Sequence, residues 1–329
     1  MGNPITSISP TESDISYVNP VFPGYFADPF VYRHEGKYYA VGTSGPEDDR
    51  SPLVFQVLKS SNLIDWEHIG YALKKLPGRE SGCYWAPEVS YRDGKFYMYY
   101  SVGEGDKLHH IRVAESITPE GPYQDLGQVT AEENPFAIDP HILNYEGEWY
   151  LFYATDQLES ERPGTVLMVD RMTSPVAVEG KPRLVAQASS DWQRYEANRF
   201  MYGGRYDWHT LEGPTVVLHE KKVYVFYSGG NWQNGSYGVD FVVADHPLGP
   251  YEDGTNSRPR VLRTVPELVI GPGHNSIIEA PDHKTLVAVY HAWNPERTAR
   301  LMRIDPIVWN EEGPVIDGPS VSLRSLKGA

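Results

Sequence analysis

Residues 93–101, "DGKFYMYYS", hold the pattern that decides the fold of this chain. Asp-Gly favours a tight hairpin turn, and the alternating aromatic run after it is typical of a β-strand. One copy alone predicts no more than a local hairpin. Four further stretches share the plan of a turn followed by an apolar strand: "EGKYYAVGTS" (35–44), "EGEWYLFYA" (146–154), "EKKVYVFYSGG" (220–230) and "HKTLVAVYHAW" (283–293).

The five stretches recur at intervals that fit one kind of architecture. Corresponding positions, Gly36, Gly94, Gly147, Lys221 and Lys284, are separated by 58, 53, 74 and 63 residues. Such intervals have room for about four short strands and their loops, which is the size of a propeller blade. We therefore predict an all-β fold, a five-bladed β-propeller with four-stranded antiparallel blades around a central channel.

The ends of the chain suggest one domain with a short extension. We expect residues 19–329 to form a single propeller domain and residues 1–18 to form an N-terminal extension. The first 20 residues contain no apolar signal core, and no apolar run approaches the length of a membrane span. These features predict a cytoplasmic protein, or an exported one whose signal has been removed, with no membrane contact.

Composition excludes several function classes. The net charge of −15 argues against nucleic acid as a partner, because binding to a polyanion depends on clustered Lys and Arg. A single cysteine, Cys83, rules out an intramolecular disulfide, and no spacing of Cys and His suggests a zinc site. The composition fits a neutral substrate or a cation better; it does not address the oligomeric state.

A second repeated element comes before each hairpin and carries polar groups. The innermost strand of each blade lines the channel of a propeller, so equivalent residues of these strands converge on one axis. We expect one cavity to be faced by Asp28, Glu88 or Trp85, Asp139, Glu212 and His274. The five stretches are "FADPFVYR" (26–33), "YWAPEVSYR" (84–92), "AIDPHILNY" (137–145), "LEGPTVVLH" (211–219) and "GPGHNSIIE" (271–279).

Converging carboxylates point to acid–base chemistry. Carboxylates that are forced together have their pKa values driven apart, and glycoside hydrolysis needs one carboxylic acid and one carboxylate at the same site. Read alone, Asp28 before Pro29 would be a turn residue. Read as one of five equivalent strand starts, it becomes a candidate base.

The motifs "FADPF", "WAPEV", "IDPHI", "EGP" and "GPGHNS", in this order, resemble those of glycoside hydrolase family 43 from Asn19 to Trp309. The resemblance implies a five-bladed propeller that hydrolyses α-L-arabinofuranosides, β-D-xylosides or, less often, galactosides with inversion. It implies that Asp28 is the general base, that Glu212 is the general acid, and that Asp139 orients this acid and raises its pKa. For an inverting pair, the base and acid carboxyls are expected roughly 6.5–9.5 Å apart.

Other positions are expected to bind the sugar. The resemblance favours Trp85 as a wall of the pocket for the terminal sugar, although an aromatic residue there could equally pack the core. Phe30 and Tyr84 are candidates for the same role, and His209 either lines the pocket or closes a turn. The resemblance also suggests that Arg300 reaches the sugar hydroxyls or the acid, with Arg303 as its competitor.

His274 resembles the family's axial histidine, which often helps to hold a calcium ion through its water shell. A possible Ca²⁺ in the central channel near His274 is therefore expected, although a buried histidine satisfied by backbone groups is the simpler reading. Calcium prefers oxygen ligands, so most of them would be waters. We expect no cofactor to be required for the chemistry.

The resulting hypothesis is an exo-acting enzyme that removes terminal α-L-arabinofuranosyl residues from plant polysaccharides or oligosaccharides. The long interval before the fourth repeat indicates an inserted loop at 189–209, which could close one end of a groove into a pocket. A β-D-xylosidase of the same fold is the alternative within the family. A non-catalytic carbohydrate-binding propeller is the alternative of a different class, since a fold does not fix a function.

Overall fold

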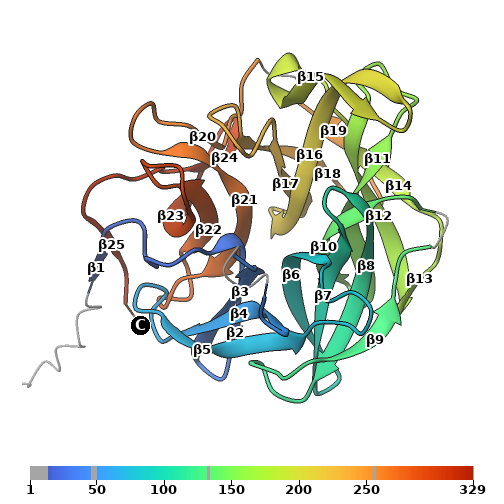
Figure 1. The fold of residues 1–329 in the computed structure, drawn as a ribbon. Helices are drawn as coiled ribbons and strands as arrows, with labels where there is room; N and C mark the ends of the chain where they lie inside the picture. The colour runs from blue at the N-terminus through green and yellow to red at the C-terminus, as the bar shows by residue number, and fades with distance from the viewer. Residues whose placement is uncertain (1–13, 46–49, 132–133, 255–256, 329) are drawn as a thin grey trace, which may run out of the picture.

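The computed structural model describes residues 14–45, 50–131, 134–254 and 257–328, and this part of the chain is mostly β-strand. The helical structure described is a short 3₁₀ turn, Asp191–Gln193. Figure 1 shows the sheets around a common centre, with β6, β10 and β21 near it and β5, β9 and β13 toward the outside. The prediction of an all-β propeller is confirmed.

Three of the expected blades are separate antiparallel sheets, each formed by four consecutive strands. The first contains β2 (Ala27–His34), β3 (Lys37–Thr43), β4 (Leu53–Ser60) and β5 (Glu67–Lys74). The second contains β6 (Cys83–Arg92), β7 (Lys95–Glu104), β8 (Lys107–Ser116) and β9 (Gln124–Gln128). The last contains β21 (Ile270–Glu279), β22 (Leu286–Trp293), β23 (Arg300–Asn310) and β24 (Gly313–Ile316).

Strands β10 to β20 form one eleven-stranded sheet. Its first half contains β10 (Ala137–Tyr145), β11 (Glu148–Gln157), β12 (Gly164–Ser174), β13 (Ala177–Val178) and β14 (Arg183–Ala186). Its second half contains β15 (Arg194–Met201), β16 (Gly204–His219), β17 (Lys222–Gly229), β18 (Gly238–Ala244), β19 (Glu252–Asp253) and β20 (Leu262–Arg263). A parallel pairing of two residues in β12 with two in β16 joins the halves. We interpret them as the third and fourth of five blades.

Hydrophobic packing supports this division. Five clusters of buried side chains lie in the described part of the chain, and four of them draw mainly on two sheets or half-sheets that follow one another in sequence. The cluster containing Val31 and Val289 joins the first sheet to the last. Burial of apolar surface between neighbouring sheets therefore continues around the whole ring, and it holds the inner strands facing one another.

The turns that precede the repeated aromatic strands have the geometry of tight hairpin turns, as predicted. Positive φ at both central residues is the signature of a type I′ hairpin turn, whose twist matches that of the flanking strands. It occurs at Glu35–Gly36, Asp93–Gly94, Glu146–Gly147 and Glu220–Lys221. The fifth hairpin, between β21 and β22, has a longer connection.

A β-bulge recurs in the inner strand of every blade. In each of β2, β6, β10 and β16, one extra residue is inserted against the partner strand, and β21 has two such bulges in succession. A bulge bends the strand and re-aims the side chains beside it. Every bulge has one residue with positive φ: Asp28, Ala86, Asp139, Gly213 and, in the two bulges of β21, Gly271 and His274.

This register corrects one expected equivalence. Asp28 and Asp139 occupy the same position in their blades, but Gly213, not Glu212, is their counterpart in the fourth blade. Glu212 lies one residue earlier, at the position that Trp85 occupies in the second blade. The acidic residues of the channel therefore start from two different backbone positions.

The two ends of the described chain meet. Strand β1 (Ile15–Tyr17) pairs with β25 (Arg324–Leu326) in a two-stranded sheet, and Tyr17 is buried in the core between the first and last sheets. Most of the expected extension, residues 1–13, lies outside the described residues, so the domain division remains a proposal. Among the described residues there is no helix with the length and apolar character of a membrane span.

Candidate active site

The inner strands bring the predicted carboxyls to one cavity. It has a volume of about 490 Å³, within the range of small-ligand pockets. Its lining is rich in charged and aromatic side chains. Those that bear on its chemistry are Asp28, Asp106, Asp139, Glu212, His274, Arg300, Tyr25, Trp85, Tyr195 and Trp232.

Asp28 is fixed by partners on both of its carboxylate oxygens. Its Oδ1 accepts a hydrogen bond from Arg300 Nη1 at 3.1 Å, and its Oδ2 accepts one from Thr43 Oγ1 at 2.5 Å. The backbone N–H of Asp28 donates to Nδ1 of His291 at 3.1 Å. Arg300 belongs to β23 of the last sheet, so the carboxylate is held across the junction between the first and last sheets.

The charge beside Asp28 keeps it ionised. Burial alone would raise the pKa of Asp28, but the Arg300 guanidinium and the nearby imidazoles of His274 and His291 bring it well below its usual value. Burial lowers the pKa of His291 to about 4, and it also lowers the pKa of His274. Both imidazoles are therefore neutral near pH 7, and Arg300 is the cation that holds the negative charge on Asp28.

Asp139 and Glu212 have the opposite electrostatics. Burial raises the pKa of Asp139 well above its usual value, and the negative charges of Glu212 and Asp28 raise it further. Burial raises the pKa of Glu212 to about 7; the hydrogen bond from Tyr237 acts against this rise, and the charge of Asp28 adds to it. Two buried carboxyls that repel each other when both are ionised retain a proton near neutral pH.

Asp139 also accepts a hydrogen bond from the backbone of β16, the strand that carries Glu212. Its Oδ2 accepts a hydrogen bond from the N–H of Gly213 at 2.9 Å, directly after Glu212. Gly213 has a φ of 58° and lies against the His274 ring, which a Cβ at this position would meet at 3.1 Å. Asp139 thus anchors the backbone from which the Glu212 side chain projects.

Tyr237 fixes one oxygen of Glu212. Its hydroxyl donates to Glu212 Oε1 at 2.6 Å, and its buried ring stacks on His291 with centroids 5.9 Å apart. Because Oε1 accepts this hydrogen bond, Oε2 is the oxygen that remains to carry a proton. Tyr237 was missed in the sequence because it lies after the fourth hairpin, outside the repeated motifs.

Aromatic side chains form the walls, and the sequence predicted one of them. Trp85 lines the cavity and stacks on His109 at a centroid distance of 3.7 Å. Trp232 lies under Arg300, whose guanidinium carbon is 4.6 Å from its ring centroid, and Tyr25 accepts a hydrogen bond from Arg300 Nη2 at 2.9 Å. Tyr25 stands three residues before Asp28, and Trp232 follows shortly after the Gly-Gly that ends the fourth repeat. Neither residue was predicted to line the cavity.

Several predicted residues lie away from this cavity. Phe30 stacks on Tyr32 in the core between the first and second sheets. Tyr84 is buried in the same core, and its hydroxyl accepts from the N–H of Leu76. His209 is buried on β16, with its Nδ1 near the carbonyl of Asp207. The structure therefore gives their expected sugar-binding role no support.

Glu88 and Arg303, the alternatives to Trp85 and Arg300, each have a polar partner in the structure. Glu88 Oε2 is 2.8 Å from His141 Nδ1, and the other ring nitrogen of His141 accepts from the N–H of Val216. Arg303 is buried and donates to the carbonyl of Ser320. Neither Glu88 nor Arg303 lines the cavity, whereas Arg300 does.

His274 faces the cavity without a set of metal ligands around it. Its Nδ1 is 3.3 Å from Asp28 Oδ1, and its backbone N–H donates to Ser228 Oγ at 2.7 Å. In the described part of the chain, no three His, Cys, Asp or Glu side chains are grouped to hold a metal ion. These residues do not fit a protein-built calcium site, and no chemical step below depends on one.

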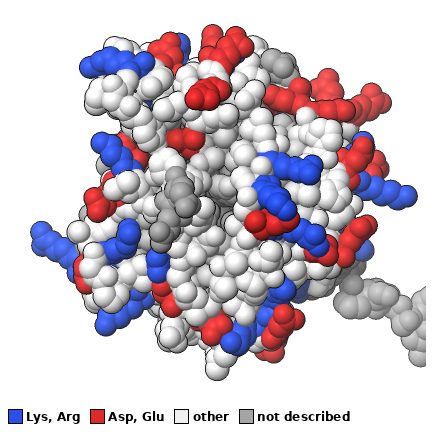
Figure 2. Space-filling model, turned by 90° about the vertical axis from the view of Figure 1, so that its right-hand side faces the viewer, with Lys and Arg blue, Asp and Glu red and all other residues white. Residues whose placement is uncertain are grey.

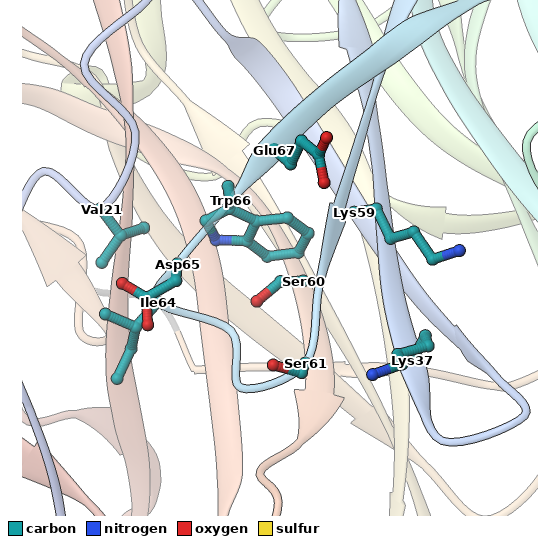
Figure 3. Close-up of a pocket in the computed structure, with 9 residues that line it drawn as sticks. All are labelled: Val21, Lys37, Lys59, Ser60, Ser61, Ile64, Asp65, Trp66 and Glu67. Atoms are coloured by element: carbon teal, nitrogen blue, oxygen red, sulfur yellow. The ribbon is translucent and has the colours of Figure 1, made fainter.

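A second hollow lacks the features of the first. It has a volume of about 620 Å³ and lies beside Trp66, and none of the predicted carboxyls lines it. Figure 3 shows the amino group of Lys59 extending away from the Trp66 ring. On the face drawn in Figure 2, side chains of both signs are interspersed without a broad basic area. The acidic cavity is therefore the candidate active site.

Comparisons with known proteins point to one class of enzyme. The family model described as glycosyl hydrolases family 43 matches residues 17–315. An extracellular exo-α-(1→5)-L-arabinofuranosidase of Streptomyces avermitilis is 27% identical over 97% of this chain and 68% of its own length. A β-D-galactofuranosidase of Aspergillus niger is 27% identical over 98% and 90%. The crystal structure of a thermostable family-43 glycoside hydrolase is 30% identical, covers 93% of this chain and 97% of that one, and has a TM-score of 0.79.

Proposed function

The chain belongs to family 43 of the glycosyl hydrolases, and on that premise we propose that it is an inverting, exo-acting α-L-arabinofuranosidase. The observation that carries the proposal is the contrast between two carboxyls at one cavity. Arg300 and its neighbours hold the pKa of Asp28 well below the usual range despite burial, while burial raises that of Glu212 to about 7. One group is thus ready to accept a proton and the other to donate one.

In the proposed reaction, Asp28 is the general base. It removes a proton from a water molecule, and the water oxygen forms a bond to the anomeric carbon of the terminal sugar. The bond from that carbon to the glycosidic oxygen breaks, and the leaving oxygen takes the proton from Glu212. Inversion places the water and the leaving group on opposite faces of the sugar ring, which requires roughly 6.5–9.5 Å between the carboxyls.

The surrounding residues have supporting roles in this proposal. Tyr237 donates to Oε1 of Glu212, which leaves Oε2 to carry the transferred proton. Asp139 holds the backbone N–H of Gly213 and keeps the acid in position. Trp85, Tyr25 and Trp232 supply the apolar walls against which a sugar face can lie.

Relatives support the sugar class. The Streptomyces avermitilis relative is an arabinofuranosidase and the Aspergillus niger relative a galactofuranosidase, so both are named for five-membered sugar rings. A putative β-xylosidase of Xylanibacter ruminicola is 24% identical over 93% of this chain, which keeps xylosides as the second candidate. We favour the arabinofuranoside.

A substrate panel tests the proposal. The protein is assayed with 4-nitrophenyl α-L-arabinofuranoside, β-D-xyloside and β-D-galactofuranoside, and with arabinan and arabinoxylan oligosaccharides. We expect arabinose to be released one unit at a time from chain ends, with the inverted anomer seen first by NMR. Asp28→Ala and Glu212→Ala should each abolish this release. Tight sugar binding without turnover would favour the non-catalytic propeller, and activity that persists in both variants would refute the assigned roles.

A further inference from the structure

A smaller cavity adjoins the candidate active site. It has a volume of about 90 Å³, and it shares Trp85, Tyr195, Glu212 and Trp232 with the larger cavity. The Glu212 carboxyl therefore stands where the two cavities meet. A group that donates a proton to a glycosidic oxygen must lie at the junction between the sugar that is released and the rest of the substrate.

The two cavities differ in what else lines them. Asp28, Asp139 and Arg300 line the larger cavity but not the smaller one. In an inverting reaction, the water held by the base attacks from the face opposite the leaving group. The leaving group therefore points away from Asp28, and the smaller cavity is on that side of Glu212.

The wall of the smaller cavity comes from the insertion noted in the sequence. Strand β15 and the first part of β16 form a hairpin, and Arg199 of this hairpin lines the cavity. Arg199 Nη2 is 2.6 Å from Asp106 Oδ2, which lies in the turn between β7 and β8 of the second blade. This ion pair therefore joins the inserted hairpin to the second blade, and it bounds the smaller cavity at the turn between β7 and β8.

Aromatic rings hold the Arg199 side chain in place. Its guanidinium carbon is 4.7 Å from the centroid of Tyr195 and 5.6 Å from that of Trp208, and only 16% of the side chain is exposed. A guanidinium carries five N–H donors in a fixed plane. Asp106 pairs with Nη2, and Glu196 Oε2 lies 3.8 Å from Nε, so the donors on Nη1 are the ones that can reach hydroxyl groups in the cavity.

We propose that the smaller cavity is the subsite for the first sugar ring of the leaving group, and that Arg199 is the specificity-determining residue that hydrogen-bonds its hydroxyls. The inference rests on the proposed function, because it takes Glu212 as the acid. The small volume admits one edge of a sugar ring, while the rest of the leaving group extends past the hairpin. The ligand class is a sugar with free hydroxyls, as opposed to an aryl group.

The test compares two substrates with the same terminal sugar. They are α-(1→5)-linked arabinotriose, whose leaving group is a sugar, and 4-nitrophenyl α-L-arabinofuranoside, whose leaving group has no hydroxyls. If the panel identifies a xylosidase, xylotriose and 4-nitrophenyl β-D-xyloside replace them. The readout is the ratio of kcat/KM for the trisaccharide to kcat/KM for the aryl glycoside.

We expect Arg199→Ala to lower this ratio about tenfold or more, since a hydrogen bond from a charged donor to the substrate is lost. Asp106→Asn should lower it less, because the aromatic rings still hold Arg199. Arg205→Ala is the matched control: Arg205 lies on the same hairpin, exposed, over the ring of Phe200, and it should leave both rates unchanged.

The outcomes separate the two proposals. An equal loss on both substrates, or an unchanged ratio, in a well-folded Arg199→Ala variant overturns the subsite. If that variant is unstable by thermal unfolding, Arg199→Lys and inhibition of the wild-type protein by arabinobiose, compared with arabinose, decide the question. Weaker inhibition by the disaccharide than by the monosaccharide would also overturn it. A wild-type protein inactive on every glycoside would refute the proposed function itself.

Discussion

The first and fourth blades each bring a carboxyl to the same cavity, and the two carboxyls have opposite electrostatic surroundings. Asp28 faces a guanidinium, a hydroxyl and two neutral imidazoles. Glu212 has one hydroxyl partner, from Tyr237, and its other neighbours include the negative charge of Asp28. Burial raises the pKa of a carboxyl in both places, but only Asp28 is in direct contact with a cation, Arg300 of the last sheet. The residue types are alike; the neighbours decide which one ionises.

The bulge register explains how one cavity accommodates both environments. Asp28 lies at the positive-φ position of its bulge, and Glu212 lies one residue before the corresponding Gly213. A shift of one residue changes the direction in which a strand side chain leaves the backbone. The repeated bulge therefore supplies two distinct positions per blade from which groups can face the channel.

The largest expected effect comes from removing each carboxyl in turn. Asp28→Asn should lower kcat/KM by about 10²–10⁴-fold on arabinotriose and on the 4-nitrophenyl glycoside alike. Glu212→Gln should cause a similar loss on arabinotriose but a much smaller one on the aryl glycoside, because 4-nitrophenolate leaves without protonation. Steady-state kinetics of both variants on both substrates check this.

Glu115→Gln, which alters a carboxylate paired with Lys95 outside the cavity, serves as the control for that comparison. A much smaller loss on the aryl glycoside than on the oligosaccharide in Asp28→Asn, with equal losses on both in Glu212→Gln, would exchange the two roles.

An intermediate effect is expected when the Arg300 guanidinium beside Asp28 is removed. In Arg300→Met, the largest effect opposing the burial of Asp28 is lost, so the pKa of Asp28 would rise, and the pKa of Glu212 would also rise because Arg300 lowers it. Both limbs of the pH profile should move to higher pH. The ratio of kcat/KM at pH 7 to that at pH 5 should rise several-fold, because more Glu212 keeps its proton at pH 7 and less Asp28 is ionised at pH 5.

Arg303→Met is the matched control, since Arg303 is a buried arginine of the same strand that donates to Ser320 outside the cavity. A pH profile that shifts equally in both variants would mean that the change reflects general destabilisation.

The smallest effect is expected at Tyr237. Its hydrogen bond stabilises the ionised form of Glu212, so Tyr237→Phe should raise the pKa of this acid by about one unit. In the proposed mechanism activity requires protonated Glu212, so we expect the wild-type protein to lose activity as pH rises through about 7. The variant should keep its activity to higher pH, with only a several-fold change in kcat at the optimum.

Tyr227→Phe provides the comparison, because this buried hydroxyl accepts from Gln193 and does not contact Glu212. An alkaline limb that stays in place in Tyr237→Phe would show that this hydrogen bond does not tune the acid.

Sequence periodicity was sufficient for the architecture. Turn residues such as Asp93–Gly94 and the alternating strands after them are local signals, so five hairpins and their order could be predicted. The convergence of Asp28, Asp139 and Glu212 followed from the symmetry of the fold. These three line one cavity in the structure, while their roles remain to be tested.

Other parts of the site depended on contacts that no local pattern encodes. The bulge shifts Glu212 by one position relative to Asp28, and a proline motif does not reveal such a shift. Tyr237 and Trp232 come from a segment after the fourth hairpin, and only its packing brings them to the carboxyls. Phe30 and Tyr84 lie in the right strands but face the core between the sheets.

The bond between Asp28 and Arg300 has a consequence for how the protein is made. It joins residues 272 positions apart, and each of the first and last sheets is built from one continuous stretch of chain. On the ribosome, Asp28 emerges early and its guanidinium partner emerges near the end of translation. A nascent or truncated chain that lacks β23 therefore lacks the cation that offsets the burial of this carboxyl. Closing the ring buries Asp28 and supplies its guanidinium partner in the same event.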